Sequence, residues 1–408
     1  MIFIQFFKSK SMELITVNEA KDVIRKNVSP LKDIILPIEQ AWGYVLSEDI
    51  ISEINIPPFR QSAMDGFAFR YAADPCNISW QIRGTIAAGS QINIALRDDE
   101  AVKIFTGAEV PDTADTIVMV EKTSVTDNRL TIDGDLISKG DHIRDVGSEI
   151  QKGDLALSCG SILTPAAVGF LASLGISRVR VKSKPAVAII VTGNELQTPG
   201  TPLLKGQVYE SNSFTLMAAL QQIGIKTDMV KIHKAPDELD HLVDTLKKAM
   251  EEADMILLTG GISAGDYDYV LAATQACGIR QLFHKVKQKP GKPLYCGRQN
   301  EKIVFGLPGN PASVLTCFYL YVTLAIDLMT GTNNRPVTSI SKLANPYHKK
   351  SGFTHFLKGM INGSEVNILG SQESYKLQSF SRANCLIEIP DSETDLSPGD
   401  MVRVHITN

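Results

Sequence analysis

The sequence predicts a multidomain α/β protein whose centre is a doubly wound, mostly parallel sheet. Between residues 181 and 331, fully apolar strand segments such as AVAIIV alternate with helical segments. This alternation is typical of a parallel sheet covered by helices on both faces. The flanking stretches instead contain short strand patterns separated by turn residues. A chain of 408 residues is also too long for one ordinary core and indicates about two to four domains.

Four regions with different patterns predict the domain boundaries. The expected domains are an elongated, discontinuous α+β linker domain (13–53 and 139–180), an inserted β domain (54–138), the α/β domain (181–331) and a C-terminal β domain, barrel or sandwich (332–408).

Composition narrows the classes of function. The net charge of −4 gives no electrostatic footprint for nucleic acid or an anionic membrane. No apolar run is expected to approach the ~20 residues that span a bilayer. The N-terminus MIFIQFFKSK lacks the features of a signal peptide, and the native start is expected near Met12, after an extension of residues 1–11. Six scattered cysteines show no metal-binding spacing. We therefore expect a reduced, cytoplasmic protein without a zinc site.

The linker domain is expected to contain helices with recognisable ends. Thr16 can cap the first helix, and a second short helical segment spans 38–45. Further along, Thr164 is expected as an N-cap, Pro165 as the first helical residue and Gly175 as the stop.

The remaining elements follow from local patterns. In the inserted domain the expected strands are WQIRGTI, AVKIFTG, TIVMVEKTSV and RLTID. In the α/β domain they are AVAIIV, IKTDMVKI, MILL and KIVFGL. The expected helices there are 212–223, 237–253, 269–277 and a long apolar helix to about Met329, with Asn310 as its cap and Pro311 in its first turn.

Similar turns follow several of these strands. The sequences are IFTG (104–107), IVTG (190–193), LLTG (257–260) and the variant FGLPGNP (305–311). Because open α/β sheets bind ligands beyond the carboxyl ends of their strands, the last three should line one crevice. The first lies in the inserted domain and could reach that crevice only across an interface. Ordinary turn glycines remain the alternative explanation.

The stretch GGISAGDYDYV after the third turn predicts an anion site. Gly260, Gly261 and Gly265 allow backbone N–H groups to point at a phosphate. Neither the dinucleotide fingerprint nor a P-loop is present. Asp266 and Asp268 would repel a phosphate unless a hard cation such as Mg²⁺ lies between them. Helix capping by these aspartates is the alternative role.

The segment HKVKQKPGKP (284–293) predicts a second anion-binding element. On a strand, Lys285, Lys287 and Lys289 would share one face, and Lys292 follows a Pro-Gly turn. Lysines are suited to phosphate or to an oxyanion such as sulfate or molybdate. A solvated strand face is the simpler alternative.

Two further acids stand in loops. In PFRQSAMDGFAF (58–69), Asp65 and Gly66 form either a hairpin turn or an interface or active-site loop. Glu195 follows the second Thr-Gly turn as a metal ligand or a plain loop residue. The sequence contains no evident Ser-His-Asp or Cys-His arrangement, so covalent catalysis is not expected.

Together these motifs resemble the molybdopterin molybdenumtransferases, the family of bacterial MoeA and the gephyrin E domain. The resemblance covers nearly the whole chain after about residue 13. It rests on the ordered segments SAMDGFA, IFTGAEVPDTADTIVMVE, IRDVGSEIQKGD, ASLGISRVRV, VTGNELQTPG, GGISAGDYDYV, KPGKP and GLPGNPAS.

The resemblance implies a molybdopterin-binding type of α/β domain and a homodimer of four-domain subunits. It implies an enzyme that inserts molybdate into adenylylated molybdopterin and releases AMP in a Mg²⁺-dependent step. The active site would lie between the α/β domain of one subunit and the inserted domain of the other. The adenylyltransferase and cofactor-accepting enzymes are further expected partners.

The resemblance also assigns roles to residues. The implied catalytic positions are Asp65, Thr106, Glu195, Asp268, Lys285 and Lys289. The implied metal ligands are Glu195, Asp266 and Asp268. The implied substrate-binding positions are Gly260, Gly261, Ser263, Gly265, Lys292, Pro308, Gly309, Asn310, Arg144, Glu149 and Ser374.

Three positions depart from the family pattern: Asn194 and Lys234 replace expected acids, and Glu373 replaces a glycine before Ser374. A molybdopterin adenylyltransferase, which resembles 181–331 alone, is one alternative function. A catalytically weak dimeric scaffold of the gephyrin type is another. An oxyanion pocket for molybdate would suit tungstate equally.

Overall fold

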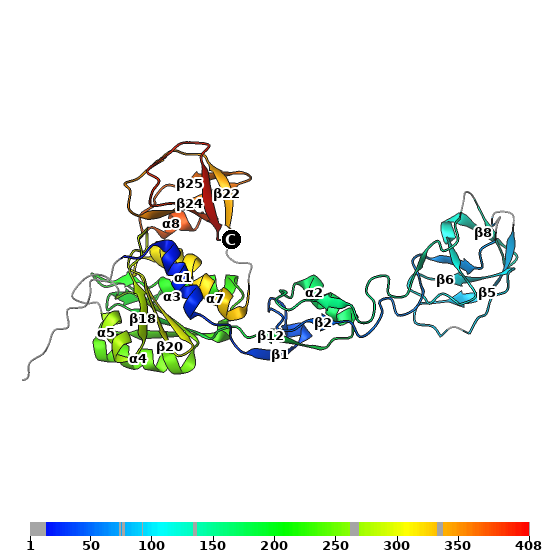
Figure 1. Ribbon diagram of the computed structural model, residues 1–408, viewed down its shortest axis with the longest axis horizontal. Coiled ribbons are helices and arrows are strands. Elements are labelled where there is room, and N and C mark those ends of the chain that lie inside the picture. Colours follow the sequence, from blue (N-terminus) through cyan, green and yellow to red (C-terminus); the bar gives the residue numbers. More distant parts are fainter. Residues whose placement is uncertain are drawn as a thin grey trace, which may run out of the picture. The chain divides into compact units, whose positions relative to one another are not determined.

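The computed structural model describes residues 14–72, 75, 78–91, 93–133, 137–261, 269–332 and 338–407 (Figure 1). The chain divides into two compact units. One comprises Met1–Ile35, Gly43–Ser47 and Arg180–Asn408, and the other comprises Leu36–Trp42 and Glu48–Val179.

A six-stranded sheet in the second unit has the order β7-β4-β6-β5-β9-β8. Its strands are β4 (Gly66–Phe69), β5 (Ser79–Ile86), β6 (Glu100–Ile104), β7 (Thr116–Met119), β8 (Thr123–Thr126) and β9 (Arg129–Ile132). Strand β4 is buried on both sides, because Ala68 packs into one apolar cluster while Phe67 and Phe69 pack into another. The strands expected within 54–138 are present, except that TIVMVEKTSV is divided into β7 and β8 by a 3₁₀ turn at Val120–Lys122.

The rest of this unit contains short elements. Strand β3 (Gln61–Ser62) pairs with β10 (Ile143–Arg144), and β2 (Ile50–Ile51) pairs with β11 (Leu155–Leu157). In helix α2 (Pro165–Ser173), the Thr164 hydroxyl accepts a hydrogen bond from the Ala167 amide, and Gly175 has φ +76°. The predicted start and stop of this helix are confirmed.

The prediction of a second helical segment over 38–45 is wrong. Residues 33–37 form strand β1 (Asp33–Pro37), and only one 3₁₀ turn (Ile38–Gln40) follows. Strand β1 pairs with β12 (Arg178–Lys182). The β-branched pair Ile34–Ile35 favours a strand, and Pro37 supplies no N–H for a preceding helical turn.

The other unit contains the six-stranded sheet β16-β13-β17-β21-β20-β18. Its strands are β13 (Val187–Thr192), β16 (Val230–Ala235), β17 (Met255–Thr259), β18 (Arg280–His284), β20 (Tyr295–Gln299) and β21 (Lys302–Leu307). Pairing is parallel from β16 to β21 and antiparallel through β20 and β18, so the sheet is mixed. The strand expected over 225–232 begins only at Val230, because Thr227–Met229 form a 3₁₀ turn.

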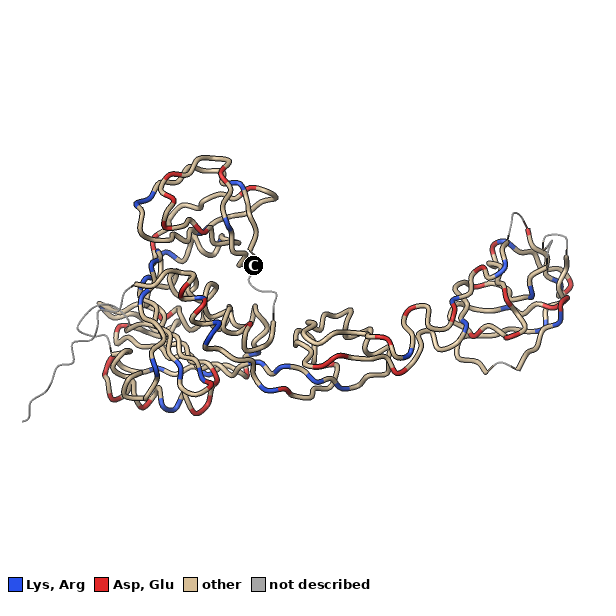
Figure 2. Tube along the Cα trace, viewed as in Figure 1, with Lys and Arg blue, Asp and Glu red and all other residues tan. Residues whose placement is uncertain are grey.

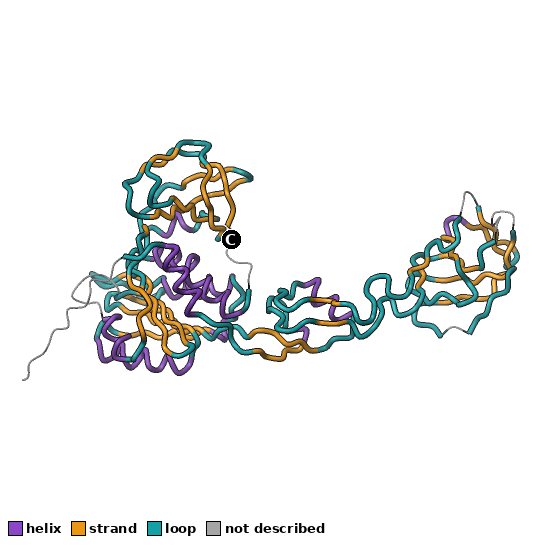
Figure 3. Tube along the Cα trace, viewed as in Figure 1, coloured by secondary structure: helices purple, strands orange, loops and turns teal. Residues whose placement is uncertain are grey.

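Helices cover both faces of this sheet, as Figure 3 shows. On one face lie α1 (Val17–Asn27), α3 (Asn212–Gln222), α6 (Pro311–Cys317) and α7 (Thr323–Thr330); on the other lie α4 (Leu239–Glu252) and α5 (Tyr269–Ala276). Within β13, Val187, Ile189 and Val191 face the first layer, whereas Ala188 and Ile190 face the second. Burial on both faces explains why this strand is apolar from Val187 to Val191.

Two helix predictions have different outcomes. Thr16 caps α1 in a capping box with Glu19, as expected. The long apolar helix is present over 311–330 but contains a π-helical turn at Phe318–Val322. This segment is long and apolar enough to span a bilayer, so the estimate that no run approaches that length is wrong. Since 83% of its most apolar window is buried, it is a core helix of the fold.

The C-terminal strands form a small closed barrel. Its strands are β22 (Thr338–Leu343), β24 (Thr354–Asn362), β25 (Glu365–Ile368), β26 (Cys385–Ile389) and β28 (Met401–Ile406). The sheet order β24-β25-β22-β28-β26 closes through pairing of β24 with β26. Strand β19 (Gln288–Lys289) adds to β24 from outside the barrel. Of the predicted alternatives, the barrel is therefore the one observed.

Acidic and basic residues are interspersed along the trace of both units, as Figure 2 shows. This distribution agrees with the small net charge of −4. Binding of anions must therefore depend on local groups of cations and backbone N–H donors.

Candidate active site

Three strand-end turns meet at the carboxyl edge of the parallel strands. Strands β13, β17 and β21 end at Thr192, Thr259 and Leu307. A Cβ atom built on Gly260 would lie 2.7 Å from the carbonyl oxygen of Thr192, and one on Gly309 would lie 3.8 Å from the Gly260 Cα atom. The structure thus brings together the three turns expected to line one crevice.

Gly260 and Gly261 open this turn with φ values of +91° and +64°. Other residues rarely adopt this left-handed conformation, and a side chain at Gly260 would also collide with Thr192. The two glycines therefore permit a close approach of backbone N–H groups to a ligand. Ser263, Gly265, Asp266 and Asp268 lie outside the described residues.

Asn212, at the start of α3, also belongs to this edge, although sequence reasoning missed it. Its Nδ2 atom donates to the carbonyl oxygen of Gly309 at 2.9 Å. Because that carbonyl only accepts, the hydrogen bond fixes the orientation of the amide. The contact ties α3 to the turn at 308–310. Its position after the strand-turn motif, at the first residue of a helix, is the one signal that the sequence offers.

The C-terminal barrel domain contributes Ser374 to the same turn. The Asn310 Nδ2 atom donates to the Ser374 hydroxyl at 2.9 Å, and the Ala312 amide donates to the Ser374 carbonyl oxygen at 3.1 Å. Asn310 occupies the predicted N-cap position, but its side chain makes no capping hydrogen bond. The expected cap is therefore replaced by a link between two domains of the unit.

Lys358, on β24, stabilises the loop that carries Ser374. Its buried Nζ atom donates to the carbonyl oxygens of Ser371, Glu373 and Lys376 at 2.7, 3.3 and 3.1 Å. Burial lowers the pKa of this lysine, yet three acceptors surround the ammonium group. Sequence reasoning missed Lys358, because a single lysine in a strand gives no local signal.

A carboxylate lies beside Asn194, where an acid was expected. The Asn194 and Asp237 side chains each accept a hydrogen bond from the other residue's backbone amide, at 3.3 Å. Lys234 instead contacts the Thr198 hydroxyl at 2.7 Å. Asp237, three residues beyond Lys234, was missed by sequence reasoning. The sequence signal that could have found Asp237 is an acid two residues after β16, the strand that pairs with β13.

Oxygen ligands for a cation are few in the described chain. No group of three His, Cys, Asp or Glu residues with metal-binding geometry occurs among the described residues. Glu195 is exposed at the end of the second turn. Two of the three expected ligands, Asp266 and Asp268, fall in the segment outside the description.

The lysine segment does not form the expected strand. Strand β18 ends at His284 and Lys285 has φ +72°. Between β18 and β19, the described residues form only an isolated bridge of Val286 to Ile15. Lys285, Lys287 and Lys289 therefore do not share a strand face, and that prediction is wrong. The reason is that the chain leaves the α/β sheet at Lys285 and joins β24 of the barrel at Gln288.

A buried glutamine supports the turn that carries Lys289 and Lys292. Gln288 is fully buried, and its Nε2 atom donates to the carbonyl oxygens of Pro290 and Gly291 at 3.0 and 3.3 Å. The Tyr321 hydroxyl donates to its Oε1 atom. Both lysines are exposed, so their ammonium groups are available on a fixed turn.

His355 lies in register with Lys289 across the β19–β24 pair. Burial, together with the positive charges of Lys349 and Lys289, lowers the pKa of His355 to about 4. Its Nδ1 atom is 2.8 Å from the Tyr347 hydroxyl. The imidazole is consequently neutral at pH 7.

This shift predicts a pH dependence of stability. Between pH about 4 and the unfolded value of about 6.5, the unfolded chain binds the His355 proton more readily. The stability from neutral His355 is present above pH 6.5 and is lost as pH falls towards 4. In thermal melts at pH 4.5 and 7.5, His355→Asn should lose less stability on acidification than the native protein. Equal losses in both proteins would contradict the assignment.

In the other unit, Asp65 and Thr106 form a pair. The Asp65 carboxylate accepts hydrogen bonds from the Thr106 amide and hydroxyl, each at 2.7 Å. The amide and then the hydroxyl lower the pKa of Asp65. Two residues 41 positions apart are thereby held at the ends of neighbouring strands β4 and β6.

Arg144 lies near this loop, whereas the backbone of Glu149 is hydrogen-bonded to a different segment. Arg144 is in register with Gln61, and its Nη1 atom donates to the Gln61 Oε1 atom at 3.3 Å. The Glu149 amide donates to the carbonyl oxygen of Ile56 at 2.9 Å, and its side chain is exposed.

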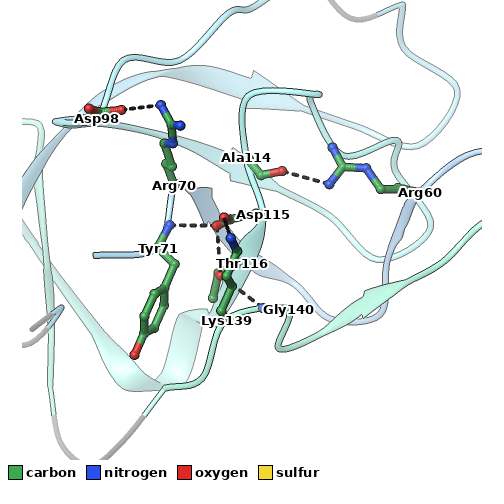
Figure 4. A network of polar contacts seen from close by, with 9 residues as sticks. All are labelled: Arg60, Arg70, Tyr71, Asp98, Ala114, Asp115, Thr116, Lys139 and Gly140. Atoms are coloured by element: carbon green, nitrogen blue, oxygen red, sulfur yellow. Dashed lines mark hydrogen bonds and ion pairs between the residues drawn. The ribbon is translucent and has the colours of Figure 1, made fainter. Parts of the chain in front are cut away.

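A polar network fixes the segment that leads into β7 (Figure 4). The Asp115 carboxylate accepts from the Tyr71 amide at 2.7 Å and lies 3.3 Å from Lys139 Nζ. Burial opposes ionisation of Asp115, but the hydrogen bonds from Tyr71, Lys139 and Thr116 lower its pKa overall. Arg60 donates to the carbonyl oxygen of Ala114 at 3.0 Å. Because β7 pairs with β4, this network also supports the strand that follows Asp65.

Family models match three stretches of the chain. The MoeA N-terminal region (domain I and II) matches residues 15–175. A probable molybdopterin binding domain matches residues 188–327, and the MoeA C-terminal region (domain IV) matches residues 341–407.

Whole-chain relatives agree with these matches. The chain is 32% identical to a molybdopterin molybdenumtransferase of Staphylococcus aureus over 403 residues, and 32% identical to one of Staphylococcus epidermidis over 406 residues. Each alignment covers 96% of both chains. A crystal structure of a molybdopterin biosynthesis MoeA protein from Pyrococcus horikoshii superimposes with a TM-score of 0.80 at 28% identity. That match covers 97% of this chain and 100% of the other.

Proposed function

The chain belongs to the MoeA family of molybdopterin molybdenumtransferases, and we propose from this premise a specific reaction: insertion of molybdate into adenylylated molybdopterin with Mg²⁺-dependent release of AMP. The chain is thus a transferase of molybdenum cofactor biosynthesis. The observation that carries the proposed reaction is the convergence of the three strand-end turns at the carboxyl edge of the sheet.

The nucleotide and pterin parts of the substrate are assigned to the carboxyl edge of β13, β17 and β21. Gly260 and Gly261 allow backbone donors to approach a phosphate. Pro308, Gly309 and Asn310 form the opposite turn, with Ser374 hydrogen-bonded to Asn310. Ser263 and Gly265 would extend the phosphate site. This arrangement supports a ligand that carries a phosphate group.

The available residues fit Mg²⁺ in their chemistry. Mg²⁺ prefers carboxylate, water and phosphate oxygens, and Glu195, Asp266 and Asp268 offer carboxylates. Asp237 supplies an acid beside Asn194, which offsets the charge lost at position 194. The bound ion would make the phosphoanhydride a better leaving bond. Around it, Glu195 and Asp237 would orient the ligand.

Molybdate is assigned to Lys285, Lys289 and Lys292. Ammonium groups would neutralise the dianion and the charge that develops on the phosphate. Asp65 and Thr106 would close over the substrate from the inserted domain of a second copy, in a homodimer. Arg144 and Glu149 would support that loop region. We place the reaction in the cytoplasm, with the adenylyltransferase and cofactor-accepting enzymes as partners.

The decisive experiment measures AMP release by the purified protein from adenylylated molybdopterin with Mg²⁺, with and without molybdate. Molybdate-dependent release is the expected result. Formation of adenylylated molybdopterin from ATP would instead identify an adenylyltransferase. Tight binding of the nucleotide without release would identify a degenerate site and favour a scaffold. Replacing molybdate by tungstate in the same assay determines the preferred oxyanion.

A further inference from the structure

We propose that Phe353, from the C-terminal barrel domain, is a positioning residue whose ring orients Lys289 and Lys292 for a tetrahedral oxyanion. The inference rests on the proposed function, because that function assigns these lysines to molybdate. It adds a residue outside the motifs that identify the family, located 61 positions beyond Lys292.

Both ammonium groups lie near the same aromatic ring. The Nζ atoms of Lys289 and Lys292 are 5.5 and 5.9 Å from the centroid of the Phe353 ring. Both distances fall within the ~6 Å at which a cation interacts favourably with an aromatic ring. Within the described chain, neither lysine forms an ion pair with an acidic side chain. Their positive charges therefore remain available to an external anion.

The backbone that carries the ring is held by hydrogen bonds. Phe353 immediately precedes β24, whose first residue, Thr354, donates from its amide to the Lys287 carbonyl oxygen at 3.0 Å. The buried Lys349 donates through Nζ to the Phe353 carbonyl oxygen at 3.0 Å. The parallel register places Gln288 opposite Thr354. The backbone at Phe353 therefore cannot shift along the lysine segment without breaking these contacts.

The lysines are likewise fixed at their backbones but not at their side-chain ends. The Gln288 side chain holds the turn through hydrogen bonds to the carbonyl oxygens of Pro290 and Gly291. An exposed lysine side chain nevertheless samples many rotamers, and two nearby ammonium groups repel each other. The negative face of the ring offsets part of that repulsion and restricts both side chains.

Neighbouring charge is consistent with this arrangement. His355 is neutral at pH 7, since its pKa is about 4, and Lys289 and Lys349 are among the causes. His355 therefore adds no positive charge to that of the two lysines at pH 7. An oxyanion dianion would gain from both ammonium groups only if they point to the same place, and the ring provides that preorganisation.

The experiment compares Phe353→Leu with Phe353→Tyr. Leucine keeps apolar volume but removes the ring, whereas tyrosine keeps the ring. We expect Phe353→Leu to raise the molybdate Kd and KM about three- to tenfold. The kcat at saturating molybdate and the thermal midpoint should stay close to those of the native protein. Phe353→Tyr should retain native affinity. An unchanged Kd in a folded Phe353→Leu protein, or equal weakening by tyrosine, would overturn the proposal.

A purely structural role would give a different pattern. It would lower the thermal midpoint and weaken nucleotide and molybdate binding together, and that outcome would also overturn the proposal. A double-mutant cycle of Phe353→Leu with Lys292→Gln should be non-additive for molybdate binding. Additive effects would mean that ring and lysine act independently, against the proposal.

A second readout does not depend on catalysis. In protein with ¹³C-methylated lysines, assigned with Lys289→Arg and Lys292→Arg, the two methylammonium signals should show ring-current shifts that disappear in Phe353→Leu. If the native protein releases no AMP but these shifts are present, the proposed reaction fails while the positioning role stands. If the shifts are absent, the positioning role fails regardless of turnover.

Discussion

Replacing Gly66 by alanine is expected to destabilise the inserted sheet and to lower the rate of turnover strongly. A Cβ atom at this position would lie 1.9 Å from the carbonyl oxygen of Val118 and 2.9 Å from its carbonyl carbon. Gly66 pairs with Ile104 on one side and Met119 on the other, so its backbone has strands on both sides. Both contacted atoms belong to the backbone of Val118, so neither is the end of a flexible side chain that could move away. The overlap must therefore separate β4 from β7.

The consequence for the site follows from the adjacent residue. Asp65 directly precedes Gly66, and its carboxylate holds the amide and hydroxyl of Thr106. Because overpacking of a filled core costs about 1–3 kcal/mol or more, the thermal midpoint of a unit of this size should fall by roughly 10 °C. Displacement of Asp65 should lower the rate of AMP release by about 100-fold, as a shift of ~1 Å can do.

Calorimetry and the AMP-release assay would check this prediction. Gly169→Ala is a suitable control, because Gly169 lies in α2 of the same unit and has no atom within 4 Å of an added Cβ. Alanine is favoured over glycine in a helix, so the control should be neutral or slightly stabilising. A Gly66→Ala protein as stable and active as the control would refute the close packing of β4 and β7.

The α/β elements could be predicted from sequence because burial on both faces leaves a clear pattern. Strand β13 is apolar up to its last residue, Thr192, and α4 shows an apolar stripe that includes Leu242 and Leu246. Prediction failed where the chain leaves one β-sheet and pairs with a strand of another. Lys285 ends pairing with one sheet before Gln288 joins another, and no local pattern of charges reports that change.

The residues of the candidate site also divide into those that a local sequence pattern predicts and those that it does not. Contiguous motifs located Gly260, the 308–310 turn and the Asp65 loop, because each motif needs particular residues at fixed spacing. Partners distant in sequence could not be found in this way. Lys358 supports the Ser374 loop, and Phe353 faces the lysine turn, only because the barrel closes beside the α/β sheet. Such contacts depend on tertiary packing, which spacing along the chain does not encode.

Asp268→Asn is expected to preserve the fold, the association state and nucleotide binding while lowering AMP release by about 100-fold or more. Asp268 immediately precedes α5, in the segment that follows β17 and the Gly260–Gly261 turn. Asparagine has nearly the same shape and is as good an N-cap as aspartate. It lacks the negative charge that a hard cation requires. The substitution therefore separates a capping role from a role in holding Mg²⁺.

The two roles predict opposite results in one assay. If Asp268 only caps α5, the variant should turn over at the native rate, and the assignment to the cation site would be wrong. If Asp268 binds Mg²⁺, turnover should fall and recover partly as Mg²⁺ is raised, since a weaker site fills at higher concentration. Asp240→Asn is the matched control, because Asp240 is an exposed acid in the first turn of α4. Only a loss confined to Asp268→Asn, with native thermal stability, ties the charge at this position to release of AMP.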